Sequence, residues 1–250
     1  MHTARKNDIC PLCHGRGIII IDKDRAAPCN CMLHRKIQVK FKKARISQEM
    51  LKCSFGQFKT RYYSKNLKDS VNGKTYFEIA SMTLSGVREF VKDVLENPSA
   101  DGLLITGPVG SGKTFLACAA ANALIDNGLE VLFVVVPDLL DQIRASYDTS
   151  SPDTEHDLMD TARSVAVLIL DDLGAHNYTD WAKNKLYTII NYRLNNRLPT
   201  LITSNLDLND LEQYLGQRTT SRIIQMCKFY RLLVETDIRM LMRRERDTHV

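Results

Sequence analysis

The sequence predicts an α/β protein, in which a parallel sheet flanked by helices follows a small module that carries cysteine pairs. From about residue 100 onward, apolar runs of strand length alternate with segments whose composition favours helix. That alternation is typical of a parallel sheet with helices on both faces. The first 31 residues differ, because they hold two closely spaced pairs of cysteines. We therefore expect a sheet domain preceded by a cysteine-bearing front module.

The predicted strands are short apolar runs at 103–106, 130–136, 165–170 and 200–205. The run 165–170 is continuously apolar, as a strand buried on both faces should be. Helices are expected at 115–124, which is rich in alanine, and at 137–145, where proline occupies a permitted first-turn position. A third helix is expected at 180–195, which is amphipathic. Residues 148–157 are polar and acidic and predict an exposed loop.

The composition is that of an ordinary globular protein. Of the 250 residues, 44% are hydrophobic and 25% charged, and the formal net charge is +5. These proportions exclude a disordered tail and a collagen-like repeat. There is no run of 18 apolar residues, and the first residues lead into a cysteine pair rather than the apolar centre of a signal peptide. We therefore expect a cytoplasmic protein with no membrane partner.

Charge is unevenly distributed along the chain. Residues 1–65 carry 15 Lys and Arg against four Asp and Glu, whereas the rest carries 19 against 25. A basic front end attracts polyanions, and it is equally what a solvated linker looks like. It contains a basic run with aromatic residues among and after it, namely Lys40, Lys42, Lys43 and Arg45 with Phe41, Phe55, Phe58, Tyr62 and Tyr63. This combination suits nucleic-acid binding and a hydrophobic anchor helix equally well.

The front module carries four cysteines with the spacing of a zinc site, at Cys10, Cys13, Cys29 and Cys31. Residues 18–21 predict a short strand, after which the chain turns back to bring the second pair to the metal. Four thiolates complete a tetrahedral Zn²⁺ shell of the structural kind. His14 and His34 are alternative ligands, and a redox dithiol at the first pair is the competing interpretation. Because so small a unit has little core, its folding should depend on the metal.

A phosphate-binding loop is the most specific motif of the sequence. The strand predicted at 103–106 leads into a glycine-rich loop and then into the alanine-rich helix, which is the context that a P-loop requires. Glycines let backbone N–H groups point at the phosphates of ATP. Lys113 should reach the β- and γ-phosphates, and the Thr114 hydroxyl should bind Mg²⁺. The expected nucleotide-binding residues are Gly107, Pro108, Val109, Gly110, Ser111, Gly112, Lys113 and Thr114.

Two carboxylates follow the strand predicted at 165–170. Asp171 is expected to hold magnesium together with Thr114, and Asp172 is the candidate for polarising the attacking water. The alternative for paired Asp residues after a strand is a helix cap or a turn. The upstream P-loop favours the first interpretation, because a P-loop needs a carboxylate on a neighbouring strand.

The order of these motifs resembles that of the AAA+ ATPases. Four motifs follow one another as in the bacterial helicase loaders of the DnaC and DnaI group and in the related IstB transposition ATPases. They are the P-loop, the Asp171-Asp172 strand end, Thr203-Ser204-Asn205 and residues 218–222. The resemblance covers roughly residues 75–245. The front module resembles the one carried by DnaI-type and phage-encoded loaders. The expected domains are a zinc-binding domain at 1–45, a basic linker or helix at 46–74 and an AAA+ domain at 75–250.

The resemblance also implies roles for particular residues. Asn205 matches the polar sensor 1 residue, which holds the attacking water. Arg222 matches the arginine finger that reaches the ATP of a neighbouring subunit, and Arg218 matches its companion. Arg239 matches sensor 2. Most AAA+ proteins have Glu where Asp172 stands, but the loader group commonly shares the Asp pair, which implies slow hydrolysis.

The function that the resemblance implies is ATP-dependent loading of a replicative DnaB-type helicase onto single-stranded DNA during primosome assembly. The protein would be a slow ATPase stimulated by its partner or by DNA, and it would assemble as a homo-oligomer through a bipartite ATP site. One alternative is a transposition ATPase of the IstB type, which acts on duplex DNA and a transposase. Another is a nucleotide-gated adaptor without a DNA role, which the acidic charge of the AAA+ part keeps open.

Overall fold

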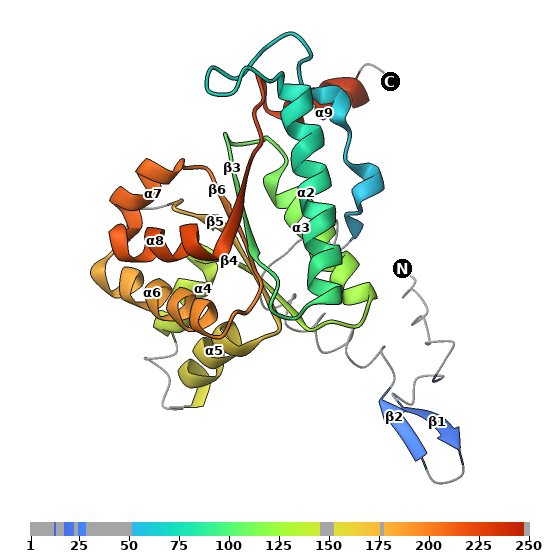
Figure 1. Ribbon diagram of the computed structural model, residues 1–250, viewed down its shortest axis with the longest axis vertical. Helices are drawn as coiled ribbons and strands as arrows, with labels where there is room; N and C mark the ends of the chain where they lie inside the picture. The colour runs from blue at the N-terminus through green and yellow to red at the C-terminus, as the bar shows by residue number, and fades with distance from the viewer. Residues whose placement is uncertain are drawn as a thin grey trace, which may run out of the picture.

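The computed structural model describes Cys13 and residues 18–22, 25–28, 52–145, 153–175 and 178–247. A five-stranded sheet of order β4-β5-β6-β3-β7 lies at its centre (Figure 1). Its strands are β3 (Gly102–Thr106), β4 (Val131–Val135), β5 (Val167–Leu173), β6 (Thr200–Ser204) and β7 (Cys227–Arg231). Every pairing within this sheet is parallel. The carboxyl ends of β3, β5 and β6 therefore meet at one edge.

Helices cover both faces of the sheet. One face carries α2 (Tyr76–Glu96) and α3 (Lys113–Asp126), and Leu103 and Ile105 of β3 point into this layer. Leu104 between them points into the other layer, so the strand is apolar at every position because both of its faces are buried. The second layer consists of α4 (Val136–Ala145), α5 (Asp153–Ser164), α6 (Asp180–Asn195), α7 (Leu208–Leu215) and α8 (Gln217–Met226) (Figure 1).

A buried arginine joins helices α5 and α6 to the start of strand β6. Arg193 of α6 has no exposed surface. Its guanidinium donates to Thr200 Oγ1 (2.8 Å) at the start of β6 and to the carbonyl oxygens of Ala162, Arg163, Val165 and Pro199. Burial lowers the pKa of Arg193 to about 9. The side chain thus satisfies carbonyls left without helical donors where α5 ends.

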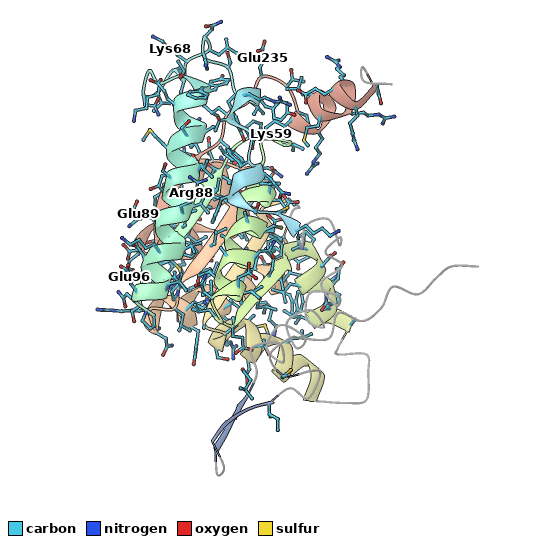
Figure 2. The ribbon with its side chains drawn as sticks, turned by 90° about the vertical axis from the view of Figure 1, so that its right-hand side faces the viewer. Lys59, Lys68, Arg88, Glu89, Glu96 and Glu235 are labelled. Atoms are coloured by element: carbon cyan, nitrogen blue, oxygen red, sulfur yellow. The ribbon has the colours of Figure 1, made fainter. Side chains whose placement is uncertain are left out.

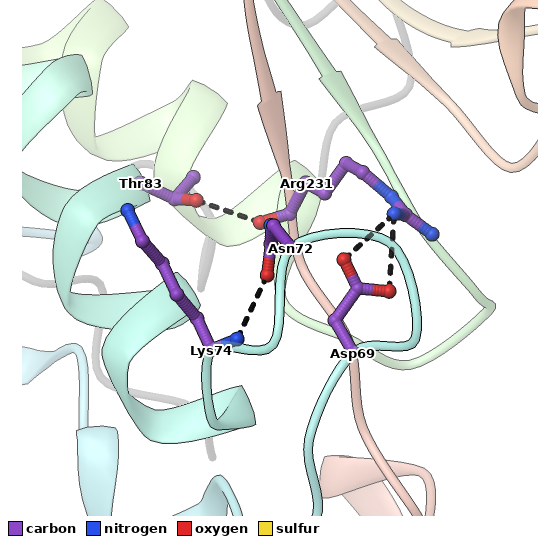
Figure 3. A network of polar contacts seen from close by, with 5 residues as sticks. All are labelled: Asp69, Asn72, Lys74, Thr83 and Arg231. Atoms are coloured by element: carbon purple, nitrogen blue, oxygen red, sulfur yellow. Dashed lines mark hydrogen bonds and ion pairs between the residues drawn. The ribbon is translucent and has the colours of Figure 1, made fainter.

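The end of β7 is held by the loop that precedes α2 (Figure 3). The buried Asp69 carboxylate accepts from the Arg231 guanidinium at 3.1 and 3.3 Å, and Thr83 Oγ1 of α2 donates to the Arg231 carbonyl at 2.7 Å. Thr75 caps α2, because its hydroxyl accepts from the backbone N–H of Glu78, whose carboxylate accepts from the N–H of Thr75. Figure 2 shows Arg88, Glu89 and Glu96 on the outer side of this helix.

Most of the predicted elements are confirmed. The four predicted strands correspond to β3, β4, β5 and β6, and the helix expected at 180–195 has the predicted bounds. Residues 153–157 belong to α5, so the expectation of a loop over 148–157 was wrong for that part. The fifth strand, β7, was not predicted, because an edge strand with Lys228, Phe229 and Arg231 exposed lacks an apolar run.

The described part of the front module is a hairpin. β1 (Ile18–Asp22) pairs antiparallel with β2 (Arg25–Pro28), and the register places Ile18 opposite Pro28. This confirms the predicted strand, and the antiparallel pairing shows that the chain turns back after it. Cys13 is buried. Cys10, Cys29 and Cys31, and the alternative ligands His14 and His34, lie outside the described residues.

Candidate nucleotide-binding site

A cavity of about 520 Å³ opens at the carboxyl edge of the sheet. It is lined by the P-loop, by residues at the carboxyl ends of β5 and β6, and by residues of the segments 53–63 and 238–242. The structure therefore brings together most of the predicted site. The predicted residues on its wall are Val109, Gly110, Ser111, Gly112, Lys113, Thr114, Asp171, Asp172, Asn205 and Arg239.

The P-loop has the backbone that phosphate binding requires. Gly110 and Gly112 have φ values of +74° and +92°, which L side chains rarely adopt. A side chain at Gly110 would overlap Asp237, so the close approach of the C-terminal segment also requires glycine there. Gly112 precedes the first residue of α3, so the helix N-terminus points its N–H groups and partial positive charge into the cavity.

Ser111 adds an unfilled hydrogen-bonding group to this cradle. Its side chain has no exposed surface. Among the described residues, its Oγ finds no hydrogen-bond partner. A buried hydroxyl without a partner destabilises a protein by about 1–3 kcal/mol, so an oxygen-rich ligand in the cradle would satisfy it. The P-loop thus fits a nucleoside polyphosphate.

Lys113 bridges the P-loop and β6. Its Nζ donates to the carbonyls of Gly107 (2.7 Å) and Pro108 (2.8 Å) and to Asn205 Oδ1 (2.7 Å). Burial lowers the pKa of Lys113 to about 8, and the nearby carboxylates of Asp172 and Asp171 oppose that shift only in part. The ammonium is therefore poised to gain from an added negative charge.

The predicted magnesium ligands contact each other. Thr114 Oγ1 donates to both carboxylate oxygens of Asp171 at 3.0 Å, and Thr203 Oγ1 donates to Asp171 Oδ1 at 2.6 Å. Burial raises the pKa of Asp171, while these hydroxyl donors act in the opposite direction. Hydroxyl and carboxylate oxygens are the ligands that Mg²⁺ prefers, so these residues fit a magnesium ion.

Asp172 and Asn205 line the cavity at the ends of β5 and β6. Asn205 Nδ2 donates to Asp172 Oδ1 at 2.6 Å, and the backbone N–H of Asp172 donates to Thr203 Oγ1 at 3.0 Å. Asp172 has a φ of +62°, a conformation that costs a non-glycine residue about 1 kcal/mol or more. The two hydrogen bonds hold the carboxylate in this strained position beside the cavity. Asn205 lies between the P-loop and β5, as the resemblance implied.

An aromatic wall on the cavity was not predicted as part of the site. Phe58, Tyr62 and Tyr63 line the cavity. Tyr63 is 2% exposed, and its hydroxyl donates to the Ser111 carbonyl at 2.6 Å. These residues belong to two short 3₁₀ turns, η2 (Phe55–Gln57) and η3 (Thr60–Tyr62), and the segments around them. In the sequence, the aromatics of 55–63 suited nucleic-acid binding and a hydrophobic anchor equally well, and local sequence could not show that their partner is the P-loop.

The opposite wall is the C-terminal helix α9 (Ile238–Asp247). The backbone N–H of Ile238 donates to the Gly110 carbonyl at 3.1 Å, and the exposed Arg239 lines the cavity. Glu245 accepts from Arg61 and from the Tyr62 hydroxyl, both at 2.7 Å. The cavity is thus bounded by two segments that are about 180 residues apart in sequence and that contact each other.

Arg218 and Arg222 lie away from this cavity. Arg222 donates to Asn191 Oδ1 at 2.6 Å and to the Arg218 carbonyl at 2.9 Å, and its guanidinium lies 4.7 Å from the centre of the Tyr187 ring. It lines a second cavity with Gly102, where β3 begins. The amino ends of parallel strands lie at the opposite sheet edge from their carboxyl ends. The structure therefore separates Arg222 from the cavity of its own chain.

The sequence profile of the family described as IstB-like ATP binding protein matches residues 89–233. The chain belongs to this family. The matched range extends from α2 to just beyond β7, and it includes the P-loop, Asp171, Asp172 and Asn205. This member of the IstB-like ATP-binding family thus carries its predicted nucleotide residues within the part that defines the family.

Relatives of this IstB-like protein include helicase loaders. It is 30% identical over 129 residues to the replicative helicase loader DnaI of Bacillus subtilis, covering 51% of this chain and 40% of DnaI. It is 26% identical over 140 residues to the loader DnaC of Escherichia coli, with 56% of each chain covered. The Bacillus subtilis protein YqaM is 29% identical over 220 residues, which are 84% of this chain and 63% of YqaM. The chain thus spans about half the length of these relatives.

Solved structures show the same fold. The crystal structure of DnaI has a TM-score of 0.60 at 25% identity, with 77% of this chain and 94% of that chain covered. The crystal structure of the DnaC helicase loader has a TM-score of 0.59 at 27% identity, with 76% and 100% covered. AMPPCP-bound DnaA of Aquifex aeolicus, at 20% identity and a TM-score of 0.54, has the same fold over 77% of this chain and 56% of that chain. Within the described residues, no helix is long and apolar enough to cross a membrane.

Proposed function

We propose that this protein is an ATP-dependent loader that binds a replicative DnaB-type helicase and delivers it onto single-stranded DNA. The observation that carries the proposal is the likeness to the DnaI and DnaC crystal structures over about three quarters of the chain, at identities of 25% and 27%. The site supports an ATP-dependent mechanism, since the cavity combines a phosphate cradle, a magnesium ligand pair and a strained carboxylate.

In the proposed reaction, the P-loop N–H groups, the Ser111 hydroxyl and Lys113 bind the phosphates of ATP. Mg²⁺, which Thr114 and Asp171 would hold, supplies positive charge that offsets the charge developing on the phosphates. Asp172 accepts the proton of the attacking water, and Asn205 orients that water from the neighbouring strand. Lys113 releases its hydrogen bond to Asn205 (2.7 Å) as it turns to the γ-phosphate, which leaves the amide available for the water.

Three further arginines complete the proposed site, one from the same chain and two from a neighbouring copy. Arg239 reaches the phosphates from α9 of the same chain, because it already lines the cavity. Arg222 and Arg218 act on the ATP of a neighbouring copy, and their position at the opposite sheet edge supports this assignment. An arginine suits the role because its planar charge spreads over phosphate oxygens at every physiological pH. Hydrolysis therefore requires a homo-oligomer.

Surface charge supports a DNA role beside the cavity. Five basic residues of the front segment (residues 52–63) and of α9 are exposed, namely Lys59, Arg61, Arg243, Arg244 and Arg246. Glu245 joins the two elements through Arg61 and Tyr62, and Figure 2 shows Lys59 and Lys68 at the end of the molecule that carries α9. Exposed Lys and Arg side chains bind phosphate backbones in a salt-dependent manner, and of these five residues Arg61 and Arg243 also pair with Glu245 and Asp247. By contrast, residues 76–237 carry 22 Asp and Glu against 13 Lys and Arg.

Co-purification with the replicative helicase of the same organism tests the loading function. We expect a complex with the wild-type protein, and helicase transfer to single-stranded DNA only when ATP is present. Lys113→Ala should bind helicase but fail to transfer it. Absence of a complex at micromolar concentrations of both proteins, with wild-type nucleotide binding intact, would contradict the loader function while leaving the nucleotide site standing.

Transposition is the second candidate, because the matching family is described as IstB-like ATP binding protein. A transposition ATPase would prefer duplex DNA and would bind a transposase. Titrating single-stranded and duplex DNA at several salt concentrations, with and without ATP, separates the two functions. Tighter binding to duplex DNA together with capture of a transposase would favour transposition.

A further inference from the structure

Two cysteine thiols meet at the wall of the nucleotide cavity. Cys53 belongs to the front segment and lines the cavity, whereas Cys118 lies on α3, five residues after Lys113. Asn122, one helical turn beyond Cys118, donates from Nδ2 to the Cys53 carbonyl at 2.9 Å. Residues four apart on a helix share a face, so this hydrogen bond fixes the Cys53 backbone over the face that carries Cys118. The Cys53 side chain packs against the buried cluster that contains Cys118, and the two side chains are in hydrogen-bonding contact.

The two thiols have different surroundings. Cys118 is 2% exposed, whereas Cys53 is partly exposed on the cavity side. The hydrogen bond from the Cys118 thiol lowers the pKa of Cys53 and raises that of Cys118, and burial raises the pKa of Cys118 further. A partly exposed thiol with thiolate character beside a protonated, buried thiol is the arrangement of an attacking and a resolving cysteine.

We propose that Cys53 and Cys118 form a peroxide-oxidisable dithiol that closes into a disulfide at the nucleotide cavity. Cys53 sulfur attacks hydrogen peroxide, so that the O–O bond breaks, a sulfenic acid forms and one water leaves. Cys118 sulfur then attacks the sulfenic sulfur; an S–S bond forms, the S–O bond breaks and the Cys118 proton leaves with the hydroxyl as a second water. The two thiols lose two electrons, and the peroxide is reduced to two waters.

The disulfide would join the front segment covalently to α3. Phe58 and Tyr63 follow Cys53 by five and ten residues, and a side chain at Gly112 would lie 3.3 Å and 3.0 Å from them. Fixing Cys53 therefore restrains the aromatic wall against the P-loop. This consequence rests on the proposed nucleotide function: oxidation should slow the release of bound nucleotide several-fold, because the wall can no longer separate from α3.

Peptide mapping of the full chain tests the dithiol without any nucleotide. After treatment with one to two equivalents of hydrogen peroxide, we expect a Cys53–Cys118 cross-linked peptide that dithiothreitol removes. Cys227, which is buried on β7, serves as the internal control and should remain a thiol. In Cys118→Ser the sulfenic acid of Cys53 should persist and react with dimedone. In Cys53→Ser no oxidation of Cys118 is expected.

Several outcomes would overturn the proposal. One is oxidation of Cys53 to sulfinic acid while Cys118 stays reduced. Another is pairing of Cys53 with a cysteine of the front module, and a third is oxidation of Cys118 in Cys53→Ser. A second arm measures dissociation of a fluorescent ADP before and after oxidation. An unchanged rate with the disulfide formed would overturn the effect on nucleotide release alone, whereas absence of ADP binding in the reduced protein would overturn the proposed nucleotide function.

Discussion

The Lys113 ammonium donates a 2.7 Å hydrogen bond to Asn205 Oδ1. This bond connects the P-loop to the end of β6, the strand that lies between β3 and β5. The same amide donates from Nδ2 to Asp172 at 2.6 Å. One side chain therefore links the group expected to sense phosphate with the group expected to activate water.

Asn205→Ala should leave nucleotide affinity within a few-fold of wild type and lower hydrolysis by about 10²-fold, as measured by filter binding and phosphate release. Asn209→Ala, an exposed change on α7, is the control.

Nucleotide affinity should depend on the protonation of Lys113. Burial lowers the pKa of this group to about 8. Bound phosphates favour the charged form and therefore raise the pKa. The contribution of the Lys113 ammonium to nucleotide affinity is therefore complete below pH 7. Affinity should fall as pH rises above 8, by up to about tenfold per pH unit.

Calorimetry at pH 9 in two buffers of different ionisation enthalpy should detect proton uptake on binding. Lys113→Arg, which keeps its charge at this pH, is the control and should take up no proton at this position. Equal proton uptake by both proteins would contradict the assignment. Lys113→Ala should lose nucleotide binding, because the cradle then lacks its buried positive charge.

Replacing the strained carboxylate should separate hydrolysis from binding. Asp172→Asn keeps the shape and tolerates the φ of +62°, but an amide cannot accept the proton of the attacking water. We expect turnover to fall by about 10²–10⁴-fold with ATP affinity nearly unchanged, in single-turnover assays. Asp210→Asn, the same change on the exposed side of α7, should leave turnover unaffected. Retention of wild-type turnover in Asp172→Asn would assign water activation to another group.

The shared site predicts complementation between two inactive variants. Arg222→Ala should bind ATP and fail to hydrolyse it, and Lys113→Ala should fail to bind it. Mixing the two should restore part of the activity, because an Arg222→Ala chain holds ATP next to an intact arginine of its neighbour. Lys92→Ala, on the exposed face of α2, should change neither assay. Full activity of Arg222→Ala at concentrations where the protein is monomeric would contradict a shared site.

The buried guanidinium of Arg193 should matter for stability rather than chemistry. Arg193→Met removes the donors of five acceptors in the second helix layer, so we expect the free energy of unfolding to fall by about 3–5 kcal/mol. Urea titration followed by circular dichroism measures the change. Arg193→Lys should recover only a fraction, because one ammonium cannot reach acceptors spread over α5 and β6. A loss below 1 kcal/mol in Arg193→Met would show that water replaces the guanidinium.

The front cysteines still predict a zinc site. Metal analysis of reduced protein should give about one zinc per chain, and chelation should unfold the front module while the sheet domain stays folded. Cys13→Ser should lower the zinc content, whereas Cys227→Ser should preserve it. Reduced wild-type protein without zinc would contradict the site.

The sequence predicted that the P-loop, Asp171, Asp172 and Asn205 come together, because phosphate chemistry restricts the local choice of residues. A P-loop needs glycines with positive φ, and Asp171 lies near the carboxyl end of the buried strand β5, so both signals lie in consecutive residues. Tyr63 and Arg193 carried no such signal. Tyr63 acquires its role only where the front segment meets Ser111, and Arg193 occupies an ordinary position on an amphipathic helix. Their partners are distant in sequence or belong to the backbone, and backbone acceptors leave no trace in the residue pattern.

The strand order has a consequence for how the chain acquires its shape during synthesis. β3 carries the P-loop at its end, yet its neighbours β6 and β7 emerge from the ribosome roughly 100 and 125 residues later. Such long-range pairings form slowly, because distant segments must be brought together first. Gly107 also rests against the Leu232 backbone just beyond β7. The nascent chain therefore exposes an unsupported interior strand until β7 has been synthesised, and any shortening before Leu232 removes a support of the phosphate cradle.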